Sequence, residues 1–302
     1  HEIGDCKDTA ALLVALYEAV GIPARMVMIR TGDLGPLATE TAILEGFNHA
    51  IAYLPEDDLW LDGTASGHDL FPPPGMDQRA RVLVVDGQAS RPQTTPSYGA
   101  GEFSYEYRLE RRDGGDFTIT IRTEDEGEAA TIRRGRFAGS RNPLRFSRWL
   151  QSQFPGAELV GDPEYDLTPG LGVATMRIDG AVDGLALTAS GGLRTFPGEF
   201  ELVEQLAPTE SRSTPLLVPV RPDLAWTMTI STGRPAGTLP EPVKLSNDYG
   251  LLEVQWDATD AGLEITGRFR LRPQLLAPSD YPAFRRFLVA AQQNLTRPVE
   301  VP

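Results

Sequence analysis

The sequence contains a single cysteine, three histidines and no long hydrophobic run. One cysteine excludes a disulfide bond within the chain. With so few thiol and imidazole groups there is no convincing metal-binding cluster, so we expect no metal and no cofactor. The most apolar stretch, residues 9–22, is shorter than the ~18 residues that a membrane helix requires. Because it also contains Glu18, it predicts a buried amphipathic helix and no membrane insertion.

Basic residues are also scarce. The chain has 28 Lys and Arg against 42 Asp and Glu, a net charge of −14. Nucleic acids and anionic membranes bind basic surfaces, so neither is expected as a partner. The arginine cluster at residues 133–136 is too short to change this, and we expect it to be a solvated strand end. The 302 residues, of which 41% are hydrophobic, suffice for two or three domains.

The only cysteine, Cys6, lies at the predicted start of a helix. Asp5 is a favourable N-cap residue, and Asp8 completes a weak capping box. Apolar residues then recur at helical spacing: Leu12, Leu13, Leu16 and Val20. Gly21 and Pro23 end the helix. In the first turn, free backbone N–H groups and the helix dipole favour a thiolate, which is the nucleophilic form, so Cys6 is a candidate nucleophile.

Two possible partners of this thiol lie on predicted strands. Short apolar or alternating runs predict strands over residues 24–29, 48–53 and 59–62, and these contain His49 and Asp62. A helix packed on such a sheet would present Cys6 to His49, with Asp62 orienting the imidazole. Taken singly, each residue has an ordinary structural interpretation, as a buried cysteine, a strand histidine and a turn aspartate. Their order within one short segment favours a thiol acyl-transfer site.

These motifs resemble those of bacterial transglutaminase-like proteins. The resemblance covers residues 2–66 and is carried by four runs: Gly4-Asp5-Cys6-Lys7-Asp8, Gly21-Ile22-Pro23-Ala24-Arg25, Phe47-Asn48-His49-Ala50 and Trp60-Leu61-Asp62-Gly63-Thr64. It implies a papain-like thiol fold, with Cys6 as nucleophile, His49 as general base and acid, and Asp62 as the residue that orients His49. It also implies a protein or peptide substrate.

A weaker resemblance extends to the C-terminus, where residues 280–287 are similar to the tail of an exported subgroup of this family. In that subgroup, proline is common at the position of Gly63. The subgroup implies a periplasmic or secreted protein. Because the chain begins five residues before Cys6, we expect the core to be incomplete at its N-terminus. The helices that precede the cysteine in the family, and any signal peptide, would lie outside this segment.

Residues 86–101 are rich in Pro, Thr, Ser and Gly and predict a linker. We therefore expect a transglutaminase-like core over residues 1–95 and a β-rich region over residues 100–302. Alternating patterns predict strands over residues 103–109, 117–121, 129–137, 173–178, 225–230, 251–256 and 263–269, and helices over 142–154 and 281–293. The predicted class is α+β, a papain-like core followed by a β-sandwich-like region with two helices.

Two functions are consistent with these patterns. The first is a thiol enzyme that acts on amide bonds by peptide hydrolysis, deamidation or transglutamination, and the sequence does not separate these three outcomes. The second is a non-catalytic protein-binding or scaffolding module with an incomplete transglutaminase-like site. The sequence predicts no oligomeric state.

Overall fold

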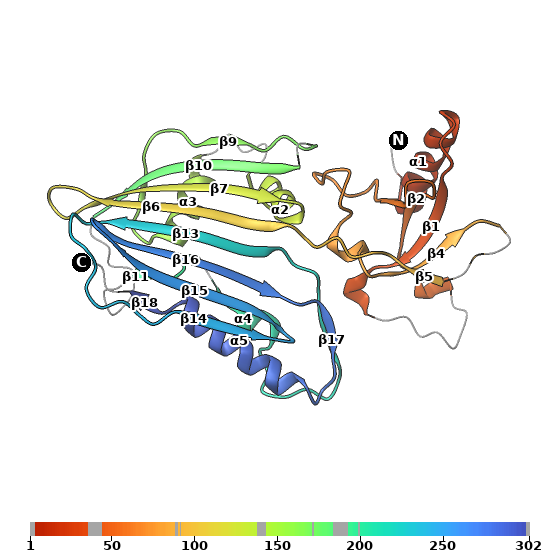
Figure 1. Ribbon diagram of the computed structural model, residues 1–302. Coiled ribbons are helices and arrows are strands. Elements are labelled where there is room, and N and C mark those ends of the chain that lie inside the picture. The colour runs from red at the N-terminus through yellow and green to blue at the C-terminus, as the bar shows by residue number, and fades with distance from the viewer. Residues whose placement is uncertain are drawn as a thin grey trace. The chain divides into compact units, whose positions relative to one another are not determined.

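The computed structural model describes residues 4–35, 44–87, 90, 92–137, 143–170, 172–183, 193–198 and 200–299. The chain divides into two compact units (Figure 1). The N-terminal unit comprises residues 1–100, 169–172 and 219–221, and the C-terminal unit comprises 101–168, 173–218 and 222–302. Both units contain helices and mainly antiparallel sheets whose strands follow one another in runs, which confirms the α+β class. Among the described residues, the helices lack the combination of length and hydrophobicity that spanning a bilayer requires.

The N-terminal unit is an antiparallel sheet with one helix packed on it. The strand order is β3-β2-β1-β4-β5. Its elements are α1 (Cys6–Ala19), β1 (Arg25–Arg30), η1 (Gly32–Leu34), η2 (Leu44–Gly46), β2 (His49–Leu54), β3 (Leu59–Leu61), η3 (Gly75–Asp77), β4 (Arg81–Val85) and β5 (Pro92–Thr94). The predicted helix and the first three predicted strands are confirmed. Part of the predicted linker forms the edge strand β5, which pairs with β4.

Helix α1 begins with the predicted capping box. The Asp5 side chain accepts hydrogen bonds from the backbone N–H groups of Lys7 and Asp8, and the Asp8 side chain accepts from the N–H of Asp5. The prediction of a buried apolar face is only partly correct. The side that faces the sheet carries Ala10, Leu13, Val14 and Tyr17. Three of the predicted core residues lie on another side and are exposed: Leu12 (60%), Leu16 (56%) and Val20 (72%).

The C-terminal unit is built on one large sheet. Its strand order is β14-β15-β16-β13-β6-β7-β10-β8, and β9 also pairs with β10. Its strands are β6 (Glu102–Arg111), β7 (Phe117–Glu126), β8 (Glu158–Leu159), β9 (Glu164–Asp166), β10 (Val173–Val182), β13 (Asp223–Ser231), β14 (Val243–Asn247), β15 (Gly250–Thr259) and β16 (Gly262–Leu271). A parallel pairing of β13 with β6 joins two antiparallel halves. Six of the seven strands predicted in this region are confirmed.

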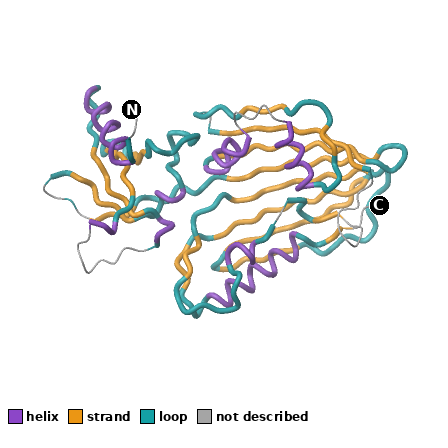
Figure 2. The backbone as a smooth tube through the Cα atoms, turned by 180° about the vertical axis from the view of Figure 1, so that it is seen from behind, coloured by secondary structure: helices purple, strands orange, loops and turns teal. Residues whose placement is uncertain are grey.

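Helices cover one face of this sheet, as Figure 2 shows from behind. They are α2 (Glu128–Phe137), α3 (Pro143–Gln153), α4 (Leu202–Leu206) and α5 (Tyr281–Leu295), and two small ribbons, β11 (Leu193–Arg194) with β18 (Pro298–Val299) and β12 (Leu216–Val218) with β17 (Gln274–Leu276), complete the unit. The apolar stripes of α3 and α5 pack on the apolar face of the sheet. The β-rich region is therefore one sheet covered by helices, whereas the sequence predicted two sheets packed as a sandwich.

Residues 129–137, predicted as a strand, form most of helix α2 instead. The buried positions follow a helical period rather than a period of two, and they are Ala129, Ala130, Arg133, Arg134 and Phe137. Alanine and arginine are also strong helix formers. The arginine cluster was predicted to be solvated, but Arg133 and Arg134 are buried.

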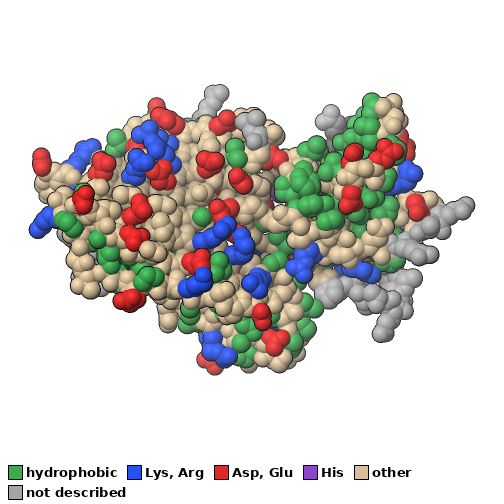
Figure 3. Space-filling view, viewed as in Figure 1, with side chains coloured by type: hydrophobic (Ala, Val, Ile, Leu, Met, Phe, Trp, Pro, Cys, Tyr) green, Lys and Arg blue, Asp and Glu red, His purple; other side chains and the backbone are tan. Residues whose placement is uncertain are grey.

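The opposite face of the large sheet is polar. Figure 3 shows Lys and Arg side chains interspersed with Asp and Glu on it. Two shallow hollows of about 810 and 720 Å³ lie on this face, on either side of Ser104 in β6. Charged residues from neighbouring strands line them, among them Arg122, Glu124, Glu253 and Arg268. This face is therefore a wide, charged surface of the C-terminal unit.

Candidate active site

Asp62 is held at the end of β3 by the turn that follows it. Its side chain has no exposed surface. Its Oδ1 accepts hydrogen bonds from the backbone N–H of Thr64 (2.8 Å) and from the Thr64 hydroxyl (2.7 Å). A short aspartate side chain commonly bonds the backbone two residues ahead in this way. These bonds fix the carboxylate and leave Oδ2 free to face His49.

Helix α1 packs closely on this turn. A Cβ atom on Gly63 would lie 2.7 Å from the side chains of both Thr9 and Leu13, so only glycine fits here without a shift. Thr9 lies three residues after Cys6, and residues at this spacing share a helix face. The turn that holds Asp62 is therefore packed against the same side of α1 that begins with Cys6.

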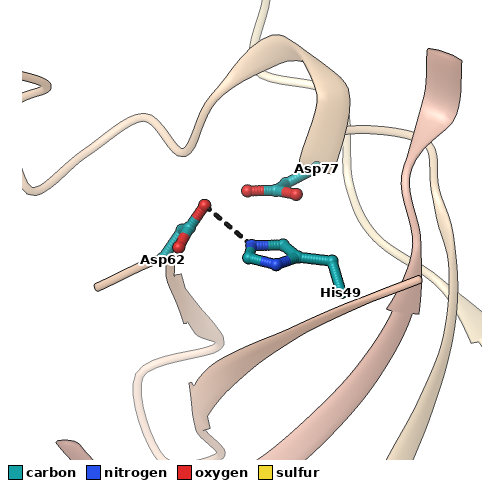
Figure 4. Close-up of side chains that lie close together, drawn as sticks. All are labelled: His49, Asp62 and Asp77. Atoms are coloured by element: carbon teal, nitrogen blue, oxygen red, sulfur yellow. Dashed lines mark hydrogen bonds and ion pairs between the residues drawn. The ribbon is translucent and has the colours of Figure 1, made fainter. Parts of the chain in front are cut away.

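His49 is the first residue of β2, which lies beside β3. Its Nε2 lies 3.1 Å from Oδ2 of Asp62, and its side chain is 11% exposed (Figure 4). The neighbouring Asn48 side chain bonds both the backbone N–H and the hydroxyl of Thr31, which fixes the start of the strand. Because an ionised carboxylate only accepts hydrogen bonds, Nε2 is the donor and Nδ1 remains for another partner.

The His49–Asp62 contact strongly shifts both protonation equilibria. The hydrogen bond to Asp62 raises the pKa of His49 to about 9 against the opposing effect of burial, and a side-chain interaction with Cys6 contributes to the increase. Burial acts to raise the pKa of Asp62, but hydrogen bonds from His49 and Thr64 outweigh it and lower that pKa to about 2. At neutral pH the pair is therefore an imidazolium facing a carboxylate.

The three residues singled out from the sequence belong to one region of the N-terminal unit. Cys6 is the first residue of α1 and is half-buried. His49 is in direct contact with Asp62, and Cys6 is among the groups that act on His49. The arrangement provides a thiol, an imidazole and a carboxylate in the order that thiol acyl transfer requires. Their catalytic roles remain a prediction.

The sequence analysis missed a fourth group, Asp77, at the end of η3. This residue has no exposed surface, and neither of its carboxylate oxygens has a hydrogen-bond partner. One ligand atom from each of Asp77, Asp62 and His49 lies within 4.8 Å of the other two (Figure 4). Burial, followed by the charge of Asp62, raises the pKa of Asp77 to about 8. In the sequence, Asp77 follows a Pro- and Gly-rich run and is typical of a turn residue.

One imidazole and two carboxyl groups at this spacing raise the question of a metal ion. A metal bound at Nε2 of His49 would replace the proton that this nitrogen donates to Asp62. We therefore interpret the three side chains as a proton-sharing cluster.

Comparison with known proteins supports the assignment of the N-terminal unit. Residues 1–61 match the transglutaminase-like superfamily, a range that includes Cys6 and His49 and ends one residue before Asp62. The chain therefore carries a transglutaminase-like core, as the sequence motifs predicted. Residues 196–301 match a family described as a domain of unknown function with solved structure, DUF3858.

Among solved structures, the chain is similar to a "putative protease" from Parabacteroides distasonis, with 12% sequence identity and a TM-score of 0.47. The match covers 95% of this chain and 42% of that chain, so this chain spans less than half the length of its structural relative. A search of curated proteins returns no match.

Proposed function

We propose that the protein is a thiol acyl-transfer enzyme that acts on amide bonds of a protein or peptide. The observation that carries this proposal is the buried His49–Asp62 hydrogen bond, which lies in a transglutaminase-like core that also contains Cys6. Such a pair is the part of a thiol site that holds an imidazolium in place.

In the proposed reaction, the Cys6 sulfur attacks the carbonyl carbon of the amide and forms a C–S bond. His49 gives its proton to the departing nitrogen as the C–N bond breaks, leaving a thioester. Water, deprotonated by His49, then attacks the thioester carbonyl; the C–S bond breaks, the carboxylic acid leaves, and the thiolate and the imidazolium are regenerated. Asp62 keeps the imidazole in one orientation and stabilises its charge. The free N–H of Cys6, at the start of α1, would donate one hydrogen bond to the oxyanion.

Hydrolysis, deamidation and transglutamination share these steps and differ in the bond attacked and in the acceptor. We propose that water is the acceptor, which gives peptide hydrolysis or deamidation, because water needs no dedicated binding site for a second substrate, whereas a lysine acceptor does. We also propose a periplasmic or secreted location on the basis of the family resemblance. Fractionation of the host cell with an antibody to this chain would test the location.

The acyl-enzyme is the direct test of the chemistry. The protein would be mixed with a p-nitrophenyl acyl ester, quenched in acid and analysed by mass spectrometry. We expect one acyl group on the peptide that contains Cys6, no adduct in Cys6→Ser, and formation at least 100-fold slower in His49→Ala. His68→Ala is a matched control on the same unit and should react like the wild type. Equal acylation of the wild type and His49→Ala would contradict the proposal.

A second candidate function is protein binding by the polar face of the large sheet. The two hollows of about 810 and 720 Å³ favour it, because mixed charges in a recess suit a polar partner. The same experiment separates the two functions. A wild-type protein that is not acylated would favour the binding module, whereas acylation that depends on His49 would favour the enzyme.

A further inference from the structure

The proposed reaction uses three of the four polar groups in the candidate site and leaves Asp77 without a role. We propose that Asp77 is a neutral carboxylic acid at neutral pH and donates its proton in a hydrogen bond to Asp62, so that it positions the charge of the His49–Asp62 pair. This inference rests on the site of the proposed function, but it concerns a proton rather than the covalent chemistry. It can therefore be tested even if the chain hydrolyses nothing.

The first argument is burial. Asp77 has no exposed surface, and neither of its oxygens has a hydrogen-bond partner. A buried, unpaired carboxylate costs far more free energy than a buried neutral acid, so such a group takes up a proton unless a cation compensates it. The imidazole that lies within 4.8 Å of Asp77, that of His49, already forms its hydrogen bond with Asp62.

The second argument is the acceptor that Asp62 offers. Its Oδ1 already accepts two hydrogen bonds from Thr64, and its Oδ2 accepts one from His49. A carboxylate oxygen can accept two hydrogen bonds, so Oδ2 has room for one more donor. Figure 4 shows the Asp77 carboxyl group beside the edge of Asp62 that faces His49. The oxygens of the two groups lie within 4.8 Å, so a small side-chain rotation brings the Asp77 hydroxyl into bonding range.

The third argument is the balance of charge around Asp77. The charges that act on it are Asp62 after β3, His49 on β2 and Asp33 on η1. Two of them are acidic and disfavour a second negative charge, and only His49 favours one. Together with burial they raise the pKa of Asp77 to about 8. With Asp77 neutral, the charges of Asp62 and His49 cancel, and the cluster adds no net negative charge near the Cys6 thiolate.

Ionisation of Asp77 at alkaline pH would therefore have a defined effect. A new negative charge would stabilise the imidazolium of His49 and disfavour both the thiolate and the oxyanion that forms from the substrate. We expect the acylation rate to fall above about pH 8 in the wild type, before His49 itself loses its proton near pH 9.

NMR titration tests the proposal directly. In protein labelled with ¹³C at aspartate carboxyl carbons, the signal that Asp77→Asn removes should report a protonated acid at pH 6.5 and titrate above pH 7. In protein with labelled histidine, which has only three histidines, the His49 signal should show an inflection near pH 8 that Asp77→Asn lacks. Asp33→Asn serves as a control: it removes a neighbouring acid, so the inflection should persist and move slightly to lower pH.

The acylation rate provides a second readout. Asparagine keeps a hydrogen-bond donor at this position, so Asp77→Asn should react within about threefold of the wild type at pH 6.5 and should not slow near pH 8. Asp77→Val, which has no donor, should react at least tenfold more slowly at pH 6.5.

Three results would overturn the proposal. A chemical shift that reports an ionised Asp77 carboxylate at pH 6 would contradict the proposal that this group is a neutral acid. Equal loss of rate in the Asn and Val variants would show that the hydrogen bond to Asp62 does not matter. Stoichiometric Zn²⁺ binding at pH 6.5 that depends on both His49 and Asp77 would make Asp77 a metal ligand instead of an acid. Failure of acylation in the wild type would refute the proposed function alone, because the NMR titration would still decide the state of Asp77.

Discussion

Each unit of this protein buries an aspartate, and the two aspartates have different neighbours. In the C-terminal unit, Asp125 on β7 is fully buried, and the guanidinium of Arg133 on α2 donates to it at 2.5 Å. In the N-terminal unit, Asp77 is equally buried and lies within 4.8 Å of another acid and an imidazole. Asp125 therefore belongs to an ion pair with Arg133, whereas Asp77 belongs to a cluster of two carboxyl groups and one imidazole.

The surroundings of the two aspartates explain this difference. Four aromatic rings surround Arg133, with centroids 5.2 to 6.0 Å from its guanidinium carbon: Phe103, Tyr105, Phe137 and Trp149. Burial raises the pKa of Asp125 as it does that of Asp77, but Arg133 opposes the increase. A shifted pKa therefore does not identify a functional group by itself. The informative feature of Asp77 is that the groups beside it are another acid and an imidazole already bonded to that acid.

Asp62→Asn should have the largest effect, because it removes the negative charge that the His49 imidazolium faces. We expect the acylation rate to fall about 10³-fold, since an amide neither stabilises the imidazolium nor enforces the same tautomer. Stopped-flow release of p-nitrophenol measures this rate. Asp58→Asn, at an exposed turn of the same unit, is the control and should leave the acylation rate unchanged. A residual rate above a tenth of the wild type would show that His49 does not depend on Asp62.

Arg133→Met tests the ion pair between Asp125 and Arg133 in the C-terminal unit. Loss of the guanidinium would leave Asp125 buried and unpaired, and we expect the free energy of unfolding to fall by about 3–5 kcal/mol. Urea denaturation measures this change. Arg136→Met, on the exposed side of the same helix, should change stability by less than about 0.5 kcal/mol. Similar values for the two variants would mean that the Asp125–Arg133 pair does not hold α2 against the sheet.

Asp77→Asn should stabilise the protein, with a defined dependence on pH. The folded state keeps Asp77 protonated up to a pKa of about 8, whereas an unfolded aspartate ionises near 3.8. The contribution of Asp77 to stability is therefore complete below pH 3.8 and is lost as the pH rises to 8. Because one pKa unit is worth about 1.4 kcal/mol, the variant should exceed the wild type by a few kcal/mol at pH 8.

At pH 4.5 the stability difference between Asp77→Asn and the wild type should be small. Urea denaturation at pH 4.5, 6 and 8 measures the trend. A difference that does not change with pH would show that Asp77 is ionised in the folded protein.

Thr64→Val should have the smallest effect. It removes the hydroxyl that donates to Asp62 and leaves the backbone N–H bond in place. A hydrogen bond to a charged group contributes about 1.5 kcal/mol, so we expect an acylation rate roughly tenfold lower. Thr94→Val, at an exposed strand end, is the matched control. No change in Thr64→Val would mean that the backbone alone orients Asp62.

The sequence predicted the helices and strands that are specified by short runs of neighbouring residues. The capping box at Asp5, strand β2 that carries His49, strand β3 that ends next to Asp62, and helices α3 and α5 follow from short periodic runs. Helix α2 was missed because its buried arginines look like surface residues until Asp125 and the surrounding rings are in place. The single covered sheet was missed for a similar reason, since helices and a second sheet can cover the same alternating strands.

Asp77 was missed because long-range contacts place it in the site. The Gln78 side chain donates to the carbonyl groups of Pro73 (2.9 Å) and Gly99 (2.7 Å) and accepts from the N–H of Tyr98 (2.7 Å). The Thr95 hydroxyl bonds the Asp77 carbonyl oxygen. These contacts join the loop that carries Asp77 to residues about 20 positions later in the chain. No local pattern reports such a connection.

The pH dependence of Cys6 alkylation tests most directly whether this cysteine and His49 act together. Iodoacetamide reacts with thiolates, and Cys6 is the only thiol in the chain. If His49 holds the thiolate as an ion pair, alkylation at pH 6 should proceed at nearly its pH 8 rate, and His49→Ala should abolish this reactivity at pH 6. A rate that rises tenfold per pH unit toward pH 8.5 in both proteins, as for an ordinary thiol, would contradict the account.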